Sequence, residues 1–252
     1  MPNRSFEAML LPMPDFLYHY MSIESLISMM NAESFQKGHL LKFHQSSIFH
    51  MNDGLEYGWF EAKTDEGGDK YIVKFEIGDP FAFCFSECED CIPMWEMYGN
   101  HAKGVCLKFY AKKLRNFIEK EVSNSFCSLS FKQINYKTFP DKRVSQNWDG
   151  RWNELCQYAQ ESIFIKSNCF KQEREWRIAS WHKAEKESKI KYKCVEGNVI
   201  PYIDLPIPAE YICEILVGPR CNSSNVNVLQ NFFYQIMGDQ HPIVKKSSVL
   251  LY

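Results

Sequence analysis

Lys171-Gln172-Glu173-Arg174-Glu175-Trp176-Arg177-Ile178-Ala179-Ser180 has the pattern of a β-strand that begins with two acidic residues. Residues i and i+2 of a strand share a face. We therefore expect Glu173 and Glu175 to point to one side of a sheet, and Trp176 and Ile178 to point to the other. Two carboxylates held side by side are unfavourable unless they are solvated, paired or used in a reaction.

Two interpretations of this pair remain open. In the first, Lys171, Arg174 and Arg177 neutralise the carboxylates on a solvated edge strand, and the pair is structural. In the second, the pair is catalytic, because cleavage of a glycosidic bond puts positive charge on a sugar carbon. A fixed carboxylate stabilises that charge, and a second one can serve the incoming acceptor.

The rest of the chain predicts α and β elements without regular alternation. In the N-terminal part we expect strands at 16–21, 40–43, 71–77, 81–86, 104–109 and 131–136. Ser22 can cap a helix in which Ile23, Leu26, Ile27 and Met30 share a face, and further helices are expected around 114–118 and 149–163. The C-terminal third predicts strands at 175–180, 190–195, 199–205, 211–217 and 248–252, and a helix over 225–237 that ends before Gly238. This order indicates an α+β fold with a split or curved antiparallel β-sheet core and flanking helices.

Composition limits the class of protein. A chain of 252 residues without a linker or charge block favours one domain over residues 1–252. The net charge of -2 argues against a strongly electrostatic nucleic-acid binder, with a local basic groove around Lys132, Lys137, Lys142 and Arg143 as the alternative. Residues 10–15 are too short and too broken by proline for a signal peptide, and no run reaches membrane-spanning length. We therefore expect a cytoplasmic protein with no membrane partner.

Ten cysteines in such a chain are expected to be reduced thiols. Four of them lie in apolar strand-like runs and are expected to be buried: Cys84, Cys106, Cys194 and Cys213. Cys84, Cys88 and Cys91 have the C-x3-C-x2-C spacing with which radical S-adenosylmethionine enzymes hold a four-iron cluster. The strand pattern around Cys84 and the acidic residues at 87, 89 and 90 argue against a cluster, so we expect no metal.

Six short blocks occur in order along the chain: Leu17-Tyr18-His19-Tyr20, residues 49–56, Cys84-Phe85-Ser86-Glu87, Met94-Trp95-Glu96-Met97-Tyr98, residues 104–109 and Glu173-Arg174-Glu175-Trp176-Arg177. In this order the blocks resemble a large bacterial family of uncharacterised domains, over about residues 16–220. Most members of that family have F-N-D-P-x-E in the second block, so Met51 and Gly54 are departures from the pattern.

That family is in turn similar to a distant branch of the ADP-ribosyltransferase fold. This resemblance implies that Glu175 is the catalytic glutamate, that Glu173 serves the acceptor, and that His19 orients the nicotinamide ribose. The NAD-binding residues that it implies are His19, Tyr20, Phe85, Ser86, Trp95 and Tyr98. Asn52 and Asp53 are either turn residues or part of a substrate loop.

The implied activity is NAD-dependent ADP-ribosyl transfer to a protein or nucleic-acid acceptor, in a bacterial toxin or phage-defence setting. NAD is then a substrate, and an NAD glycohydrolase with water as acceptor is the closest variant. The alternatives are a non-catalytic module that binds a nucleotide or a peptide on the same fold, and the radical S-adenosylmethionine enzyme. In the structural alternative, His19 is an ordinary strand histidine, and Trp95 and Tyr98, spaced i and i+3, are core residues.

Overall fold

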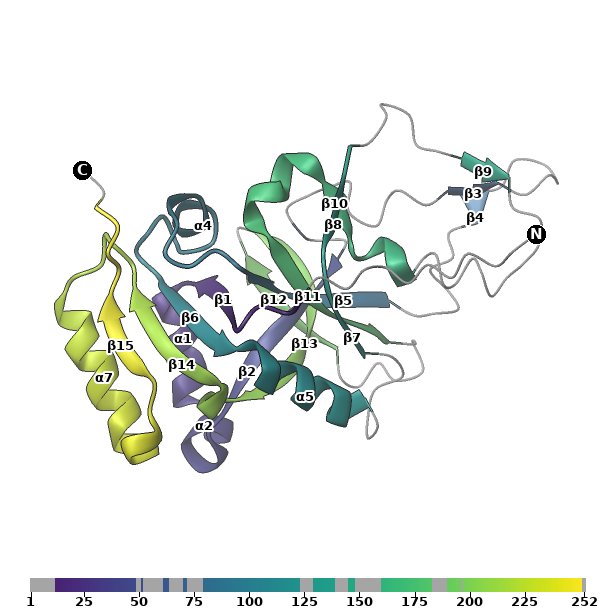
Figure 1. Ribbon diagram of the computed structural model, residues 1–252. Helices are drawn as coiled ribbons and strands as arrows, with labels where there is room; N and C mark the ends of the chain where they lie inside the picture. The colour runs from purple at the N-terminus through teal and green to yellow at the C-terminus, as the bar shows by residue number, and fades with distance from the viewer. Residues whose placement is uncertain are drawn as a thin grey trace.

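The protein is described by a computed structural model over residues 12–48, 51, 61–63, 70–71, 79–122, 129–138, 145–147, 160–182, 190–195 and 197–250. A sheet crosses the centre of the molecule and helices flank it (Figure 1). The strands of this main sheet are β1 (Phe16–Met21), β2 (Leu40–Ser47), β5 (Asp79–Ser86), β6 (Val105–Tyr110), β7 (Leu129–Gln133), β11 (Glu175–His182), β12 (Lys191–Val195), β13 (Asn198–Pro208), β14 (Ile212–Val217) and β15 (Ile243–Lys246).

The main sheet is mostly antiparallel. Its strands lie in the order β12-β13-β2-β5-β1-β6-β14-β15, and β11 pairs with both β5 and β7. The pair β14 and β15 is parallel, and α7 (Ser224–Met237) connects the two strands. The predicted mixture of helices and a mostly antiparallel sheet is therefore confirmed.

Smaller elements complete the described chain. A parallel pair joins β8 (Asn135–Lys137) to β10 (Ile165–Ser167), and a separate sheet contains β3 (Glu61–Lys63), β4 (Lys70–Tyr71) and β9 (Ser145–Asn147). The remaining helices are α1 (Ile23–Asn31), α2 (Glu33–Gly38), α4 (Ile92–Met97) and α5 (Ala111–Val122), and the 3-10 helices are η2 (Asn168–Glu173), η4 (Ala209–Tyr211) and η5 (Gly238–Gln240). Ser22 caps α1 as predicted, because its Oγ accepts a hydrogen bond from Ser25 N at 3.1 Å.

The central strands β1 and β5 pack on the apolar core and diverge at the site. Phe83, Phe85 and Phe109 pack edge to face in the largest apolar cluster, with ring centroids 4.9 and 5.4 Å apart. Strands β1 and β6 form six residue pairs, whereas β1 and β5 form one, Tyr18 with Ser86. Where β1 and β5 separate, the imidazole of His19 reaches the Cys84 carbonyl oxygen.

Several predicted elements differ from the structure. Residues 248–250 do not form the strand expected over 248–252, because Ser248 N donates to the Asp90 carboxylate at 2.8 Å instead of to a strand. The strand expected over 131–136 is divided at Ile134 into β7 and β8, and β15 was not predicted. Cys194 is exposed on β12 rather than buried. Most of the strand expected over 71–77 and of the helix expected over 149–163 lies outside the described residues.

We expect Gly104→Ala to lower the free energy of unfolding by about 3 kcal/mol or more, whereas Gly38→Ala should change it by less than about 1 kcal/mol. A Cβ added at Gly104 would lie 2.1 Å from the Met21 carbonyl oxygen and 2.8 Å from that of Gly99, and backbone atoms cannot move aside as a side chain can. A Cβ at Gly38 meets nothing within 4 Å. Urea denaturation of the two variants measures the difference, and equal stabilities would contradict this packing.

Candidate functional site

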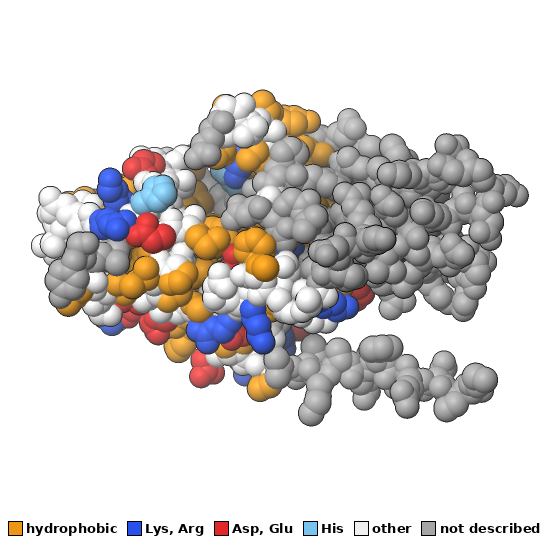
Figure 2. All heavy atoms as spheres, turned by 90° about the horizontal axis from the view of Figure 1, so that it is seen from above, with side chains coloured by type: hydrophobic (Ala, Val, Ile, Leu, Met, Phe, Trp, Pro, Cys, Tyr) orange, Lys and Arg blue, Asp and Glu red, His pale blue; other side chains and the backbone are white. Residues whose placement is uncertain are grey.

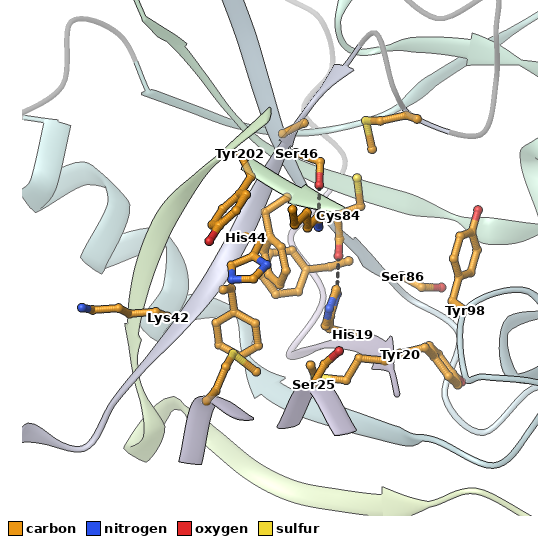
Figure 3. Close-up of a pocket in the computed structure, with 18 of the residues that line it drawn as sticks. His19, Tyr20, Ser25, Lys42, His44, Ser46, Cys84, Ser86, Tyr98 and Tyr202 are labelled. Carbon is orange, nitrogen blue, oxygen red and sulfur yellow. Dashed lines mark hydrogen bonds between the residues drawn. The ribbon is translucent and has the colours of Figure 1, made fainter. Parts of the chain in front are cut away.

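A cavity of about 820 Å³ is lined by residues of β1, β2, β5, β12, β13 and α1, together with Lys166, Glu173 and Glu175. Figure 3 shows its labelled side chains in two groups. Lys42, His44, Ser46 and Tyr202 form one group, Ser86 and Tyr98 belong to the other, and His19 lies between them. The cavity therefore brings together residues that are far apart in the sequence.

One end of the cavity, called the carboxylate end below, is a buried ionic cluster of Glu173, Glu175, Lys166 and Arg177. The Lys166 ammonium group lies 2.8 Å from Glu173 Oε2 and 3.0 Å from Glu175 Oε2. Arg177 donates from Nε and Nη2 to Glu175 Oε1 at 2.9 and 2.7 Å. All four side chains are at most 5% exposed. Two cations balance two anions, as burial of charge requires.

The two carboxylates meet through a turn and not through strand alternation. Strand β11 begins at Glu175, whereas Glu173 is the last residue of η2. Arg174 between them has φ 43°, in the left-handed region, and its guanidinium group donates to Cys88 Sγ at 3.0 and 3.2 Å. The prediction that one strand carries both glutamates was therefore wrong, although their carboxylates do share one cation.

The interpretation of a solvated edge strand was also wrong. Strand β11 pairs with β5 on one side and β7 on the other, and Glu173 and Glu175 are 2% and 4% exposed. Of the three cations proposed to neutralise the pair, Arg177 contacts Glu175, and Arg174 turns instead to Cys88. Lys166, which was not among these three cations, contacts both carboxylates.

The environment pushes the pKa values of the two carboxyl groups apart. Burial raises the pKa of Glu173, and the neighbouring Lys166 and Tyr98 only partly offset it. Burial acts in the same direction on Glu175, but the charges of Arg177 and Lys166 outweigh it and lower the pKa of Glu175. Glu175 is thus held as an anion, while Glu173 accepts a proton more readily. This separation is typical of carboxylate pairs with two different roles in acid-base chemistry.

His19 is a neutral hydrogen-bonding group in the cavity wall. Burial lowers the pKa of His19 to about 4, so the ring is uncharged at neutral pH. Its Nδ1 lies 2.8 Å from the Cys84 carbonyl oxygen, which can only accept a hydrogen bond. Nδ1 therefore carries the proton, and Nε2 is left as an acceptor for a hydroxyl group of a ligand.

The other expected NAD-binding residues divide into two kinds. Tyr20, Phe85, Ser86 and Tyr98 line the cavity, and the Tyr98 hydroxyl donates to Glu173 Oε1 at 2.7 Å. Trp95 does not line it. Its side chain is fully buried, packs edge to face on Tyr20 at 4.9 Å and donates from Nε1 to Asp90 at 2.8 Å. The structural alternative is therefore correct for Trp95.

Ser86 has a supporting contact that the sequence did not indicate. Its hydroxyl donates to the Glu173 carbonyl oxygen at 2.6 Å and accepts from Cys88 N at 2.9 Å. Because both contacts are to backbone, Ser86 fixes the end of η2, and thereby Glu173, instead of offering a free hydroxyl to a ligand. The Glu175 backbone is fixed from the other side, since Glu175 N donates to the Tyr136 hydroxyl at 2.8 Å.

The remaining expected groups lie elsewhere or outside the described chain. Asn52 and Asp53 are not among the described residues. Cys84 lines the cavity, and Cys88 is buried against Arg174. Among the residues that the structure describes, no group of three or more His, Cys, Asp or Glu side chains is arranged to hold a metal ion.

Acidic and basic side chains are interspersed over the described part of the face seen from above (Figure 2). This mixture agrees with the net charge of -2. A surface of mixed charge provides little long-range attraction for a polyanion.

His19 makes the stability of the protein depend on pH. The folded-state pKa of about 4 lies below the reference value of 6.5, so the unfolded chain binds the proton first and stability falls as pH drops from about 6.5 to 4. Over this pH range we expect the free energy of unfolding to fall by up to about 3 kcal/mol more in the wild type than in His19→Gln, because Gln does not titrate. Urea denaturation at a series of pH values measures this difference, and parallel pH profiles would contradict a neutral, half-buried imidazole at this position.

Removal of the Lys166 charge tests the buried ionic cluster. Lys166→Met leaves two buried carboxylates with one cation, so we expect the free energy of unfolding to fall by about 3 kcal/mol or more at pH 7. The loss should become smaller as the pH is lowered, because burial raises the pKa of Glu173 and favours its protonation. Lys132→Met is the matched control, because Lys132 forms an exposed pair with Glu161 and should contribute less than about 1 kcal/mol. Thermal and urea denaturation measure both variants. If Lys166→Met and Lys132→Met lower the stability equally, the cluster is effectively solvated.

Comparison with known proteins finds a similarity to one family over part of this site. Residues 94–178 match the model of DUF2971, a family described as proteins of unknown function. The match confirms, for that segment, the predicted relation to an uncharacterised domain, and the segment includes Tyr98, Lys166, Glu173, Glu175 and Arg177. Searches of curated proteins and of solved structures gave no significant match. Among the described helices, none is long and apolar enough to cross a membrane.

Proposed function

We propose that this protein consumes NAD at the carboxylate end of the cavity and transfers ADP-ribose to a protein or nucleic-acid acceptor, or to water. The observation that carries the proposal is the pair Glu173 and Glu175, buried at the wall of one cavity with their pKa values shifted in opposite directions. The proposal includes an ADP-ribosyltransferase-like arrangement of the sheet. The divergence of β1 and β5 beside His19 supports that arrangement.

The chemistry assigns a different role to each group. The bond between ribose C1′ and the nicotinamide nitrogen breaks, its electron pair leaves with neutral nicotinamide, and positive charge develops on the ribose. Glu175, held ionised, stabilises that charge more in the transition state than in the ground state. Glu173 takes the proton of the attacking hydroxyl or water as the new bond to C1′ forms.

His19 and the aromatic side chains supply binding and orientation. The acceptor Nε2 of His19 can receive a hydrogen bond from a ribose hydroxyl. Tyr98, whose hydroxyl contacts Glu173, offers ring surface near the carboxylates for a flat nicotinamide. Phe85 touches the cavity from the core, since it is 2% exposed and packs on Phe83 and Phe109. A cavity of about 820 Å³ is within the range of about 300–1,000 Å³ that is typical of ligand sites.

One observation favours a second candidate, a non-catalytic module that binds a nucleotide. Both oxygens of Glu175 already have cationic partners, Arg177 on one and Lys166 on the other. A carboxylate in such a cluster has less charge available for an oxocarbenium ion, and an ionic cluster of this kind can be purely structural. Turnover, rather than binding, is therefore the property that separates the two candidates.

The test is Glu175→Gln, which keeps shape and a hydrogen-bond acceptor but removes the charge. We expect nicotinamide release to fall by about 10²–10³-fold, with the Kd for NAD changed by less than about threefold. Glu161→Gln is the matched control, because Glu161 forms an exposed ion pair with Lys132 and does not line the cavity, and it should leave turnover unchanged. Nicotinamide release is measured by chromatography with cell lysate as acceptor, and thermal melting checks that each variant is folded.

Glu173→Gln separates the two forms of the reaction. If Glu173 serves the acceptor, labelled ADP-ribose incorporation should fall further than nicotinamide release, since water can still attack. Equal losses in both assays would contradict the acceptor role. Absence of wild-type turnover in any lysate, with NAD binding retained in calorimetry, would leave the binding module as the function.

A further inference from the structure

The end of the cavity opposite the carboxylates is basic. Lys191 and Lys193 are two residues apart on β12 and share a face, and Lys42, His44 and Ser46 do the same on β2. The register places these groups on one face of the sheet, because Lys191 pairs with Tyr202 of β13 and Tyr202 pairs with Ser46 of β2. We call this group the basic end of the cavity.

Lys193 is the central group of the basic end. Its side chain is half-buried, its Nζ donates to Ser46 Oγ at 3.2 Å, and it lies 5.7 Å from the centre of the Tyr202 ring. Burial lowers the pKa of Lys193, and no carboxylate among the described residues forms an ion pair with it. Lys191, two residues earlier, is already paired with Asp204 at 2.7 Å. Among the described residues, no carboxylate therefore contacts the Lys193 ammonium group, since Asp204, which lines the same cavity, is paired with Lys191.

The neighbours of Lys193 favour an anion next to a flat group. The rings of His44 and Tyr202 lie next to each other (Figure 3), with centroids 4.0 Å apart and an angle of 34° between them. The Lys193 ammonium group lies 5.7 Å from the centre of the Tyr202 ring. Burial and the nearby charge of Lys193 lower the pKa of His44. A half-buried cation without a carboxylate, next to hydroxyl and aromatic groups, provides what a phosphate ester of a nucleotide requires.

We propose that the basic end is a diphosphate-binding subsite, in which Lys193 and Ser46 contact the phosphates of the nucleotide whose ribose lies at the carboxylate end. The assignment of NAD as the ligand rests on the proposed function, whereas the affinity for diphosphate does not. The subsite fixes the direction of the ligand, with the phosphates toward β12 and the scissile bond toward β11.

The experiment measures calorimetric binding of inorganic pyrophosphate, ADP-ribose and adenosine to the full chain. A charged hydrogen bond contributes about 1.5–3 kcal/mol. We therefore expect Lys193→Gln to raise the Kd for pyrophosphate and for ADP-ribose by about 10–100-fold, and to change the Kd for adenosine by less than about threefold. Lys193→Arg should retain most of the affinity, because it keeps the charge. Lys245→Gln is the matched control, since Lys245 lies on β15 and is paired with Glu214. Melting temperatures check that all variants are folded.

The outcomes distinguish the subsite from the proposed function. In NAD turnover, Lys193→Gln should raise KM by at least about tenfold and change kcat by less than about threefold. If Lys193→Gln loses pyrophosphate binding and the wild type shows no NAD turnover, the subsite is supported and the proposed enzymatic function is overturned. The subsite would be overturned if the wild type turns over NAD and Lys193→Gln keeps both the pyrophosphate affinity and the KM of the wild type. The proposed enzymatic function would then still stand. No binding of pyrophosphate or ADP-ribose to the wild type would also overturn the subsite.

Discussion

One ammonium group, that of Lys166, holds together the two carboxylates on which the proposed chemistry depends. It lies 2.8 Å from one carboxylate and 3.0 Å from the other, in a region that water scarcely reaches. Burying charge is costly, and the cost is offset only when partners are close and complementary. Arg177 supplies the second cation and is itself anchored, because its Nη1 donates to the Ile163 carbonyl oxygen at 2.6 Å. The cluster is thus balanced in charge, and each member limits where the others can lie.

The sheet provides the rigid frame for this cluster. Strand β11 has neighbours on both sides. The Glu175 backbone is paired with Ser86 of β5, and its carbonyl oxygen accepts a hydrogen bond from Ile134 N at 2.9 Å just beyond β7. Glu173 is outside the ladder, and Ser86 at the end of β5 holds it through its carbonyl oxygen. The left-handed Arg174 between them is a locally unfavourable conformation for a non-glycine residue. Such a conformation persists where surrounding contacts determine it, as the contacts of Arg174 with Cys88 do here.

Local patterns predicted much of the frame and part of the site. Alternation and helix spacing identified β1, β5, β6, α1 and α7, because each buries an apolar face that its own sequence reveals. The role of Lys166 could not be predicted in this way, since its two partners follow it across a 3-10 helix and a turn. A lysine directly after Ile163-Phe164-Ile165 is a signal for a buried cation, but it does not name the partner. Trp95 and Tyr98 show the same limit, because spacing alone does not reveal which ring enters the core and which reaches Glu173.

The two ends of the cavity differ in how their charged side chains are paired. Arg177 supports Glu175 without lining the cavity, so Lys166 is the buried cation that faces the ligand beside two buried carboxylates. At the opposite end the half-buried Lys193 has no carboxylate partner among the described groups. The field of Lys193 at the basic end favours a ligand whose anionic part lies there, whereas the carboxylate end is balanced in charge and adds little net field. The uncharged imidazole of His19 lies between the two ends and disturbs this field little. A protonated ring at the same position would add a positive charge and change the field.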